Sequence, residues 1–141
     1  MRNKTVKSKK SGKLYNFIII ILSVFLVVSV LTLALNIRDD MQWRANTAKD
    51  MSYNYEGNNY YYLVRKMYEN ESNHVKTDAW MEEYYAVARY YEAALRQKAY
   101  AEAGQSERAE AFQAVMEEQI PLMGPYTDCI SKIEEMLQSN F

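Results

Sequence analysis

The sequence has 141 residues, of which 49% are apolar and 25% are charged, and its formal net charge is −1. With only four glycines and two prolines, it is not a low-complexity or intrinsically disordered chain. A single cysteine, Cys129, excludes an intramolecular disulfide framework, and a single histidine, His74, excludes sites that require two histidines.

The near-zero net charge hides three segments of different character. Residues 1–13 form a basic tail with six basic residues and no acidic one. Residues 14–37 carry no charge. Residues 38–141 hold the other 11 basic residues and all 18 acidic ones, so this part is strongly acidic. The charge pattern therefore separates a tail, an apolar stretch and a body.

The uncharged stretch predicts a transmembrane helix. Phe17 to Leu35 contains 15 Leu, Ile, Val or Phe residues in 19, and at about 1.5 Å per residue it spans roughly 29 Å, close to a hydrocarbon core of about 30 Å. One alternative is a buried core helix, but a soluble protein does not need one that is apolar on every side. The other is a cleaved signal peptide, but no small-x-small cleavage site follows the stretch. We therefore expect an uncleaved signal anchor over residues 14–37.

The basic residues that flank this helix predict its orientation. Six lie within 15 positions before the span, whereas three, Arg38, Arg44 and Lys49, lie within the same distance after it. The positive-inside rule then places the N-terminus in the cytoplasm and the body outside. Tyr15 and Trp43 are near the two ends of the span, where amphipathic rings settle. The predicted localisation is the cell membrane, with a single span and an extracytoplasmic C-terminal domain.

The absence of glycine and proline between Gly12 and Gly57 predicts a helical stalk over residues 38–56. The stalk either continues the membrane helix directly or forms a separate short helix after a kink. An α-helical domain over residues 57–141 follows. Its first helix begins after an Asn-Asn cap, and its apolar residues recur at spacings of three and four. These residues are Tyr61, Val64 and Met67 or Tyr68.

Three further helices are predicted in this domain. Thr77 caps the longest one, which Gly104 ends. Ser106 caps the next, and Pro121 and the Gly124–Pro125 pair break the chain before a last helix. No segment alternates with period two, so no sheet is expected and the fold class is all-α. The predicted buried residues are Trp80, Tyr84, Val87, Tyr91, Ala94 and Leu95; Ala109, Phe112, Val115, Met116 and Ile120; and Tyr126, Ile130, Ile133, Met136 and Leu137.

Residues 99–121 carry a packing aromatic, a helix stop, a small residue for a close helix crossing and a second stop. These residues are Tyr100, Gly104, Ala109 and Pro121. At this spacing the segment resembles a tetratricopeptide-type helical hairpin, although the Trp-x-x-Leu-Gly part is missing and no second copy lies about 34 residues away. The resemblance implies an antiparallel helical hairpin and protein binding, since such hairpins serve as scaffolds.

Patterns for catalysis and metal binding are not found in the sequence. Glu71 and His74 match the Glu-x-x-His half of a di-iron site, but the other half needs a second histidine. Cys129 follows Asp128, which disfavours a thiolate, so we expect a buried thiol, with an intermolecular disulfide as the alternative. We therefore predict no catalytic residue, no cofactor and no metal site, and a protein that is not an enzyme. The acidic body excludes duplex nucleic acid as a natural partner.

Tyrosine is the anomaly of the composition, with 13 in the chain. Several are adjacent, and because neighbouring helix positions point about 100° apart, they cannot all face one core. Tyr61, Tyr62, Tyr85 and Tyr90 are therefore predicted to form a partly exposed surface for a protein or a glycan. Packing at the rim of a small core is the alternative. The Asn70-Glu71-Ser72 segment is a glycosylation sequon.

These features predict a single-pass, membrane-anchored helical protein that acts as an interaction or scaffold subunit at the cell envelope. Its expected partners are the membrane and another envelope protein, and a homo-oligomer is left open. The alternative function is a membrane-tethered domain that binds a small ligand or a glycan through the tyrosine-rich surface.

Overall fold

The computed structural model describes the backbone of residues 5–139 and the side chains of residues 12–139. Arg2 and Lys4 of the basic tail lie outside the described residues. The described chain has no strand, so the predicted all-α class is confirmed. It divides into two compact units, Met1–Ala45 and Asn46–Phe141. The helices are α1 (Thr5–Glu56), α2 (Tyr60–Ser72), α3 (Ala79–Glu102), α4 (Ser106–Gln119) and α5 (Cys129–Ser139), with the short 3₁₀ helices η1 (Ile120–Leu122) and η2 (Gly124–Tyr126) before α5.

The first unit contains the apolar part of α1. Every described side chain from Gly12 to Gln42 is exposed. By length and composition this helix can cross a membrane: the most apolar stretch of 18 residues has a mean hydropathy of 3.1, and none of it is buried. The Thr32 hydroxyl donates a hydrogen bond to the Val28 carbonyl oxygen at 2.9 Å, which satisfies this polar group within the helix.

Helix α1 continues without a break through residues 38–56, so the predicted stalk is helical and no separate short helix forms. The second compact unit begins at Asn46, inside this helix, whereas the sequence analysis began the α-helical domain at Gly57. The reason is a stripe at four-residue spacing on the last turns of α1, where Thr47, Met51 and Tyr55 are all buried.

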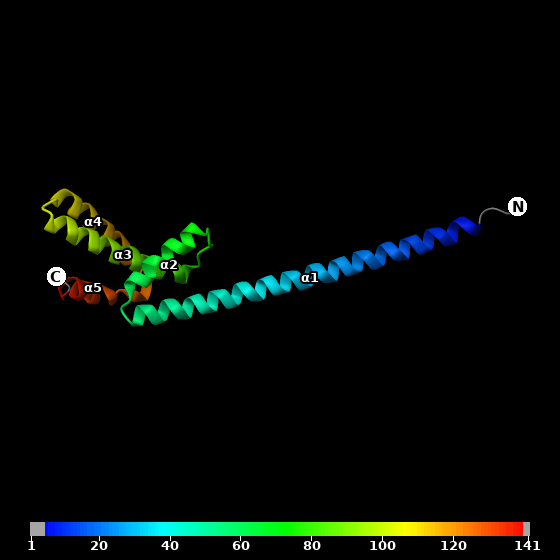
Figure 1. The fold of residues 1–141 in the computed structure, drawn as a ribbon, viewed down its shortest axis with the longest axis horizontal. Helices are drawn as coiled ribbons and strands as arrows, with labels where there is room; N and C mark the ends of the chain where they lie inside the picture. The colour runs from blue at the N-terminus through cyan, green and yellow to red at the C-terminus, as the bar shows by residue number, and fades with distance from the viewer. Residues whose placement is uncertain (1–4, 140–141) are drawn as a thin grey trace. The chain divides into compact units, whose positions relative to one another are not determined.

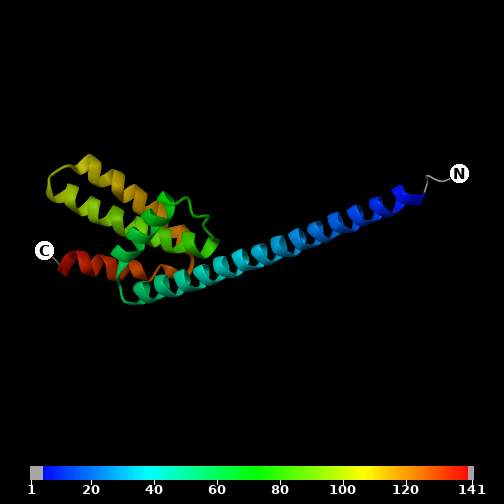
Figure 2. The same cartoon turned by 45° about the vertical axis from the view of Figure 1, so that its right-hand side comes forward.

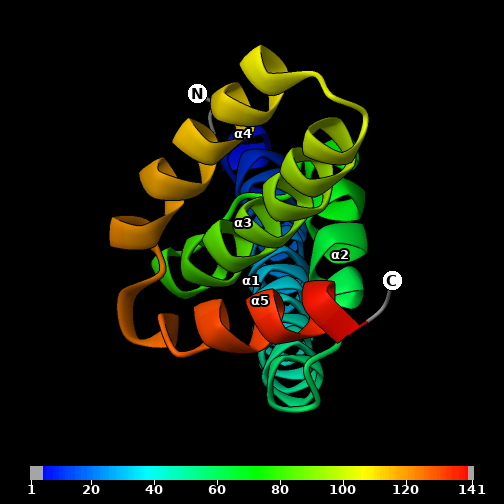
Figure 3. The same ribbon diagram turned by 90° about the vertical axis from the view of Figure 1, so that its left-hand side faces the viewer.

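Helix α3 is the central helix of the second unit. It packs against α2 and α4 and also contacts η1, η2 and α5, and Figure 3 shows it passing between α2 and α4. Figures 1 and 2 show α3 and α4 side by side as an antiparallel hairpin. Because α3 has neighbours on several sides, its buried arc is wider than one stripe. Its buried residues are Met81, Tyr84, Tyr85, Ala86, Val87, Ala88, Tyr90, Ala93 and Ala94.

The predicted core of α3 is correct in part. Tyr84, Val87 and Ala94 are buried as expected. Trp80 and Tyr91 are only half-buried, and the prediction for Leu95 is wrong because this side chain is 38% exposed. A prediction of burial from one apolar stripe fails for a helix that packs against neighbours on more than one side.

The helix ends follow the predicted signals, with shifts of one residue. The Asn59 side chain caps α2 by accepting a hydrogen bond from the Tyr62 amide at 3.3 Å. Gly104 ends α3 with φ +71°, and the Gln105 amide donates to the Tyr100 carbonyl at 2.9 Å, as in a Schellman motif. The two remaining caps are displaced: Asp78 and Gln105 stand at the N-cap positions of α3 and α4, each one residue from the predicted Thr77 and Ser106.

The C-terminal elements bury fewer residues than the sequence analysis predicted. In α4, Ala109 and Met116 are buried, Phe112 and Val115 are half-buried, and Ile120 is 37% exposed and lies in η1, against the prediction. The proline and glycine signals produce η1 and η2, and Tyr126 lies in η2 and not in the last helix. In α5, Cys129 and Ile133 are buried, while three residues are half-buried: Ile130, Met136 and Leu137.

Candidate functional site

Four tyrosine rings from different elements form an aromatic cluster in the second unit. Tyr84 stacks on Tyr126 with ring centroids 4.5 Å apart. Tyr55 makes edge contacts with Tyr126 at 4.9 Å, with Tyr84 at 5.9 Å and with Tyr60 at 6.2 Å. Such pairs stabilise a core beyond their buried area, by about 0.5–1.5 kcal/mol each. Much of the tyrosine surplus is therefore core and not surface.

The cluster is closed by a polar contact at its edge. The Tyr55 hydroxyl donates to the Asp128 carboxylate, and its oxygen also lies 3.2 Å from the Tyr126 carbonyl oxygen. Lys132 donates to the same carboxylate at 3.2 Å. These hydrogen bonds, that of Tyr55 first, lower the pKa of Asp128. Burial is the main reason that the pKa of Tyr60 is raised to about 12 and that the pKa of Tyr55 is also raised. The hydroxyls of Tyr55 and Tyr60 thus remain neutral at ordinary pH.

Two of the four predicted surface tyrosines are in the core. Tyr85 is 0% exposed and Tyr90 is 3% exposed, so the prediction of a partly exposed surface is wrong for both. Both lie on α3, which is covered from more than one side. The predicted set of four therefore does not form one surface.

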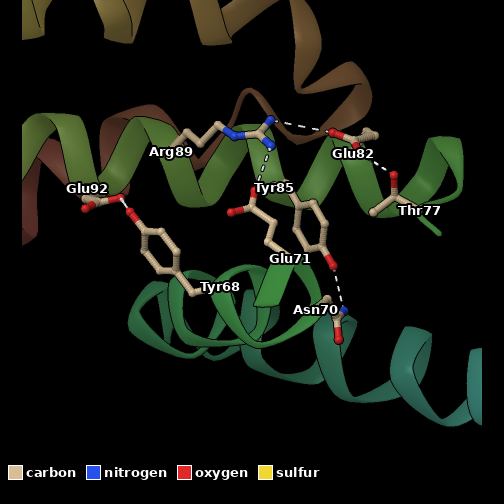
Figure 4. Close-up of polar contacts among 8 residues, drawn as sticks. All are labelled: Tyr68, Asn70, Glu71, Thr77, Glu82, Tyr85, Arg89 and Glu92. Atoms are coloured by element: carbon tan, nitrogen blue, oxygen red, sulfur yellow. Dashed lines mark hydrogen bonds and ion pairs between the residues drawn. The ribbon is translucent and has the colours of Figure 1, made fainter. Parts of the chain in front are cut away.

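Tyr85 has a specific polar partner that the sequence analysis missed. The Asn70 amide nitrogen donates to the Tyr85 hydroxyl at 2.6 Å (Figure 4), and Asn70 is only 2% exposed. The sequence contains a signal for this, because Tyr60, Leu63, Met67 and Asn70 share one face of α2 and are its buried residues. The sequon asparagine is therefore inaccessible in the folded domain.

The other two predicted residues, Tyr61 and Tyr62, lie on α2. Tyr61 is 68% exposed. Tyr62 is half-buried, and the Arg65 guanidinium carbon lies 5.5 Å from its ring centroid. Tyr61, Arg65 and Tyr68 are spaced at i, i+4 and i+7 and are all exposed, so they share the face opposite the buried stripe. We call these three residues the α2 ridge.

A shallow groove of about 150 Å³ borders the α2 ridge where α2, α3 and α4 meet. The Tyr68 hydroxyl donates to Glu92 at 2.7 Å, and Arg89 pairs with Glu71 at 3.4 Å and with Glu82 at 3.5 Å (Figure 4). Within the groove Arg96 pairs with Glu92, and the apolar lining residues are Ala93, Phe112 and Val115. The lining residues are Tyr68, Arg89, Glu92, Ala93, Arg96, Phe112 and Val115.

Cys129 and His74, which were considered for redox and metal chemistry, do not line this groove. Cys129 is a buried free thiol, and its pKa is raised to about 11 by burial and then by the nearby Asp128. His74 is exposed in the loop after α2, with φ +52°. Within residues 12–139, no group of three His, Cys, Asp or Glu side chains is placed to hold a metal ion.

Comparisons of this chain with protein-family models, with curated proteins and with solved structures find no match. The tetratricopeptide-like character of residues 99–121 accordingly remains a prediction, although α3 and α4 do form a helical hairpin.

Proposed function

We propose that this chain is a single-pass membrane protein whose exported helical domain serves as an interaction or scaffold subunit at the cell envelope. The observation that carries the membrane anchor is the exposure of every side chain from Leu14 to Ile37. Exposure of a helix that is apolar on all sides to water is unfavourable, whereas its transfer into a bilayer is favourable. For 15 large apolar residues the free energy of insertion is favourable by on the order of 5–9 kcal/mol.

The orientation in this proposal is N-terminus in the cytoplasm, supported by the six basic residues before the span against three within the same distance after it. Cys129 reports the side of the membrane, because an impermeant thiol reagent labels it in intact cells after mild unfolding only if the domain is outside. Labelling that requires broken cells would overturn the orientation. Changing the six N-terminal basic residues to Gln should weaken or invert it.

The interaction role is supported by the α2 ridge. Tyrosine and arginine are the residue types most enriched among the energetic anchors of protein interfaces, together with tryptophan. Tyr61 and Tyr68 are among the few large aromatic side chains that the second unit leaves exposed, with 68% and 48% exposure. We propose that they contact another envelope protein.

The test is capture of partners by the full chain from a mild detergent extract. The variant carries Tyr61→Ser with Arg65→Ser, and the control carries Glu117→Ser with Glu118→Ser on the exposed face of α4. The ridge variant should retain its helical circular dichroism but bind its partner about 30-fold more weakly, as expected for loss of about 2 kcal/mol. The control should change neither. Equal capture by both variants would exclude the ridge as the contact.

The ligand-binding alternative has weaker support. Sites for small molecules usually measure about 300–1,000 Å³. The groove beside the α2 ridge measures about 150 Å³, and two other grooves of the second unit measure about 290 and 260 Å³. A domain that retains a glycan through purification and captures no protein would favour this alternative.

A further inference from the structure

We infer that the basic tail over residues 1–13 binds the headgroups of anionic lipids in the leaflet that it faces. This inference depends on the membrane anchor of the proposed function. The tail carries Arg2, Lys4, Lys7, Lys9, Lys10 and Lys13 without any acidic residue. Clusters of four to eight basic residues next to a membrane helix are attracted to anionic lipid surfaces.

The structure adds that residues 5–13 of the tail and the apolar span belong to one helix. Helix α1 begins at Thr5 and continues through the apolar stretch without a break. The Cα atoms of Lys7, Lys9, Lys10 and Lys13 are therefore held at defined heights along the axis of the same helix that enters the bilayer. A flexible tail would not fix these heights.

The helix rise gives the heights above the start of the apolar run at Phe17. Lys13 lies about 6 Å and Lys10 about 10 Å before this residue, while Lys7 lies about 15 Å before it. The headgroup layer adds roughly 5–8 Å to each side of the hydrocarbon core, and the surface potential decays over about 8–10 Å. The basic residues close to the span should therefore contribute most, at about fivefold in affinity each.

A soluble polyanion such as nucleic acid is the competing partner for a basic segment. The lipid surface is favoured because the anchor holds the tail at the headgroups, so binding needs no second association event. Nucleic acid would have to be recruited from solution against the screening of physiological salt.

The test reconstitutes the full chain into nanodiscs of equimolar phosphatidylcholine and phosphatidylglycerol. Native mass spectrometry then measures how many molecules of each lipid remain bound to the protein that is released from the nanodiscs. We expect a preference for phosphatidylglycerol that decreases as the salt concentration rises. The variant Lys13→Gln, close to the span, should reduce this preference by about fivefold, whereas Lys7→Gln, farther along the same helix, should reduce it less than about twofold.

The possible outcomes distinguish failure of the lipid inference from failure of the proposed membrane anchor. A chain that does not enter nanodiscs contradicts the proposed membrane anchor itself. A chain that enters them without preferring phosphatidylglycerol contradicts only the lipid inference. Equal effects of Lys13→Gln and Lys7→Gln contradict presentation by a continuous helix. Loss of the preference on addition of a short DNA duplex at 0.1 M salt would assign the tail to a soluble polyanion instead.

Discussion

At the scale of single residues, the hydrogen bond from Asn70 to Tyr85 is a buried polar contact between α2 and α3. Both side chains are buried, and each supplies the hydrogen bond that the other would otherwise lack. Burial raises the pKa of Tyr85, and the hydrogen bond from Asn70 opposes that shift. A buried polar pair of this kind fixes the register of α2 on α3, since a slip by one residue would leave both groups unpaired.

Replacement of Tyr85 by Phe tests this pair. The variant keeps the ring but leaves the Asn70 amide without its partner, so the free energy of unfolding should fall by about 1–3 kcal/mol. Chemical denaturation of the full chain in detergent, followed by circular dichroism, measures the change. The matched control is Tyr61→Phe, which removes an exposed hydroxyl and should change stability by less than about 0.5 kcal/mol. Equal stability of both variants would show that the pair contributes nothing.

The buried tyrosines predict a loss of stability at alkaline pH. Tyr60 has its pKa raised to about 12 in the folded state, mainly by burial, from an ordinary value of about 10. Its contribution is complete below about pH 10 and is lost as the pH rises through the folded pKa. We expect a late phase of tyrosinate absorbance to coincide with loss of the helical circular dichroism. A helix signal that survives after all tyrosines have ionised would contradict this.

At the scale of the helices, the sequence predicts the ends better than the buried faces. Glycine, proline and asparagine act locally, so the stop at Gly104 and the cap at Asn59 were predictable. The buried face of α2 was missed although the spacing of Tyr60, Leu63 and Met67 indicates it, because three consecutive tyrosines blur the helical phase and the stripe ends in the polar Asn70. The predicted surface failed at Tyr85 and Tyr90 for a different reason: burial of α3 is set by α2 and α4, which local spacing does not report.

Gly104 offers a test of the turn between α3 and α4. Its φ of +71° is unfavourable for residues with a Cβ atom, yet an added Cβ would have no atom within 4 Å. The change Gly104→Ala should therefore cost about 1–2 kcal/mol through backbone conformation alone. Thermal unfolding measures it, and Gly104→Asn should cost less because asparagine tolerates this region. An alanine variant as stable as the parent would mean that the turn adopts another geometry without loss.

At the scale of the whole molecule, the apolar helix is the feature on which the functional proposal depends. If it is an uncleaved signal anchor, the mature protein retains the entire stretch from Phe17 to Leu35. The intact mass of the purified protein decides this, and we expect a species that begins at Met1 or Arg2. A species that begins near Asn36 would identify a cleaved signal peptide and a product without an anchor.

Because Cys129 is buried, the reaction of its thiol reports local opening of the domain. The thiol is 0% exposed, its sulfur lies 3.9 Å from that of Met123, and its pKa is raised to about 11. Because a thiol reagent needs both access and the thiolate, native protein should react only while α5 is transiently detached. With no second cysteine in the sequence to contribute, the reaction half-life of the native protein would measure how often this helix leaves the core.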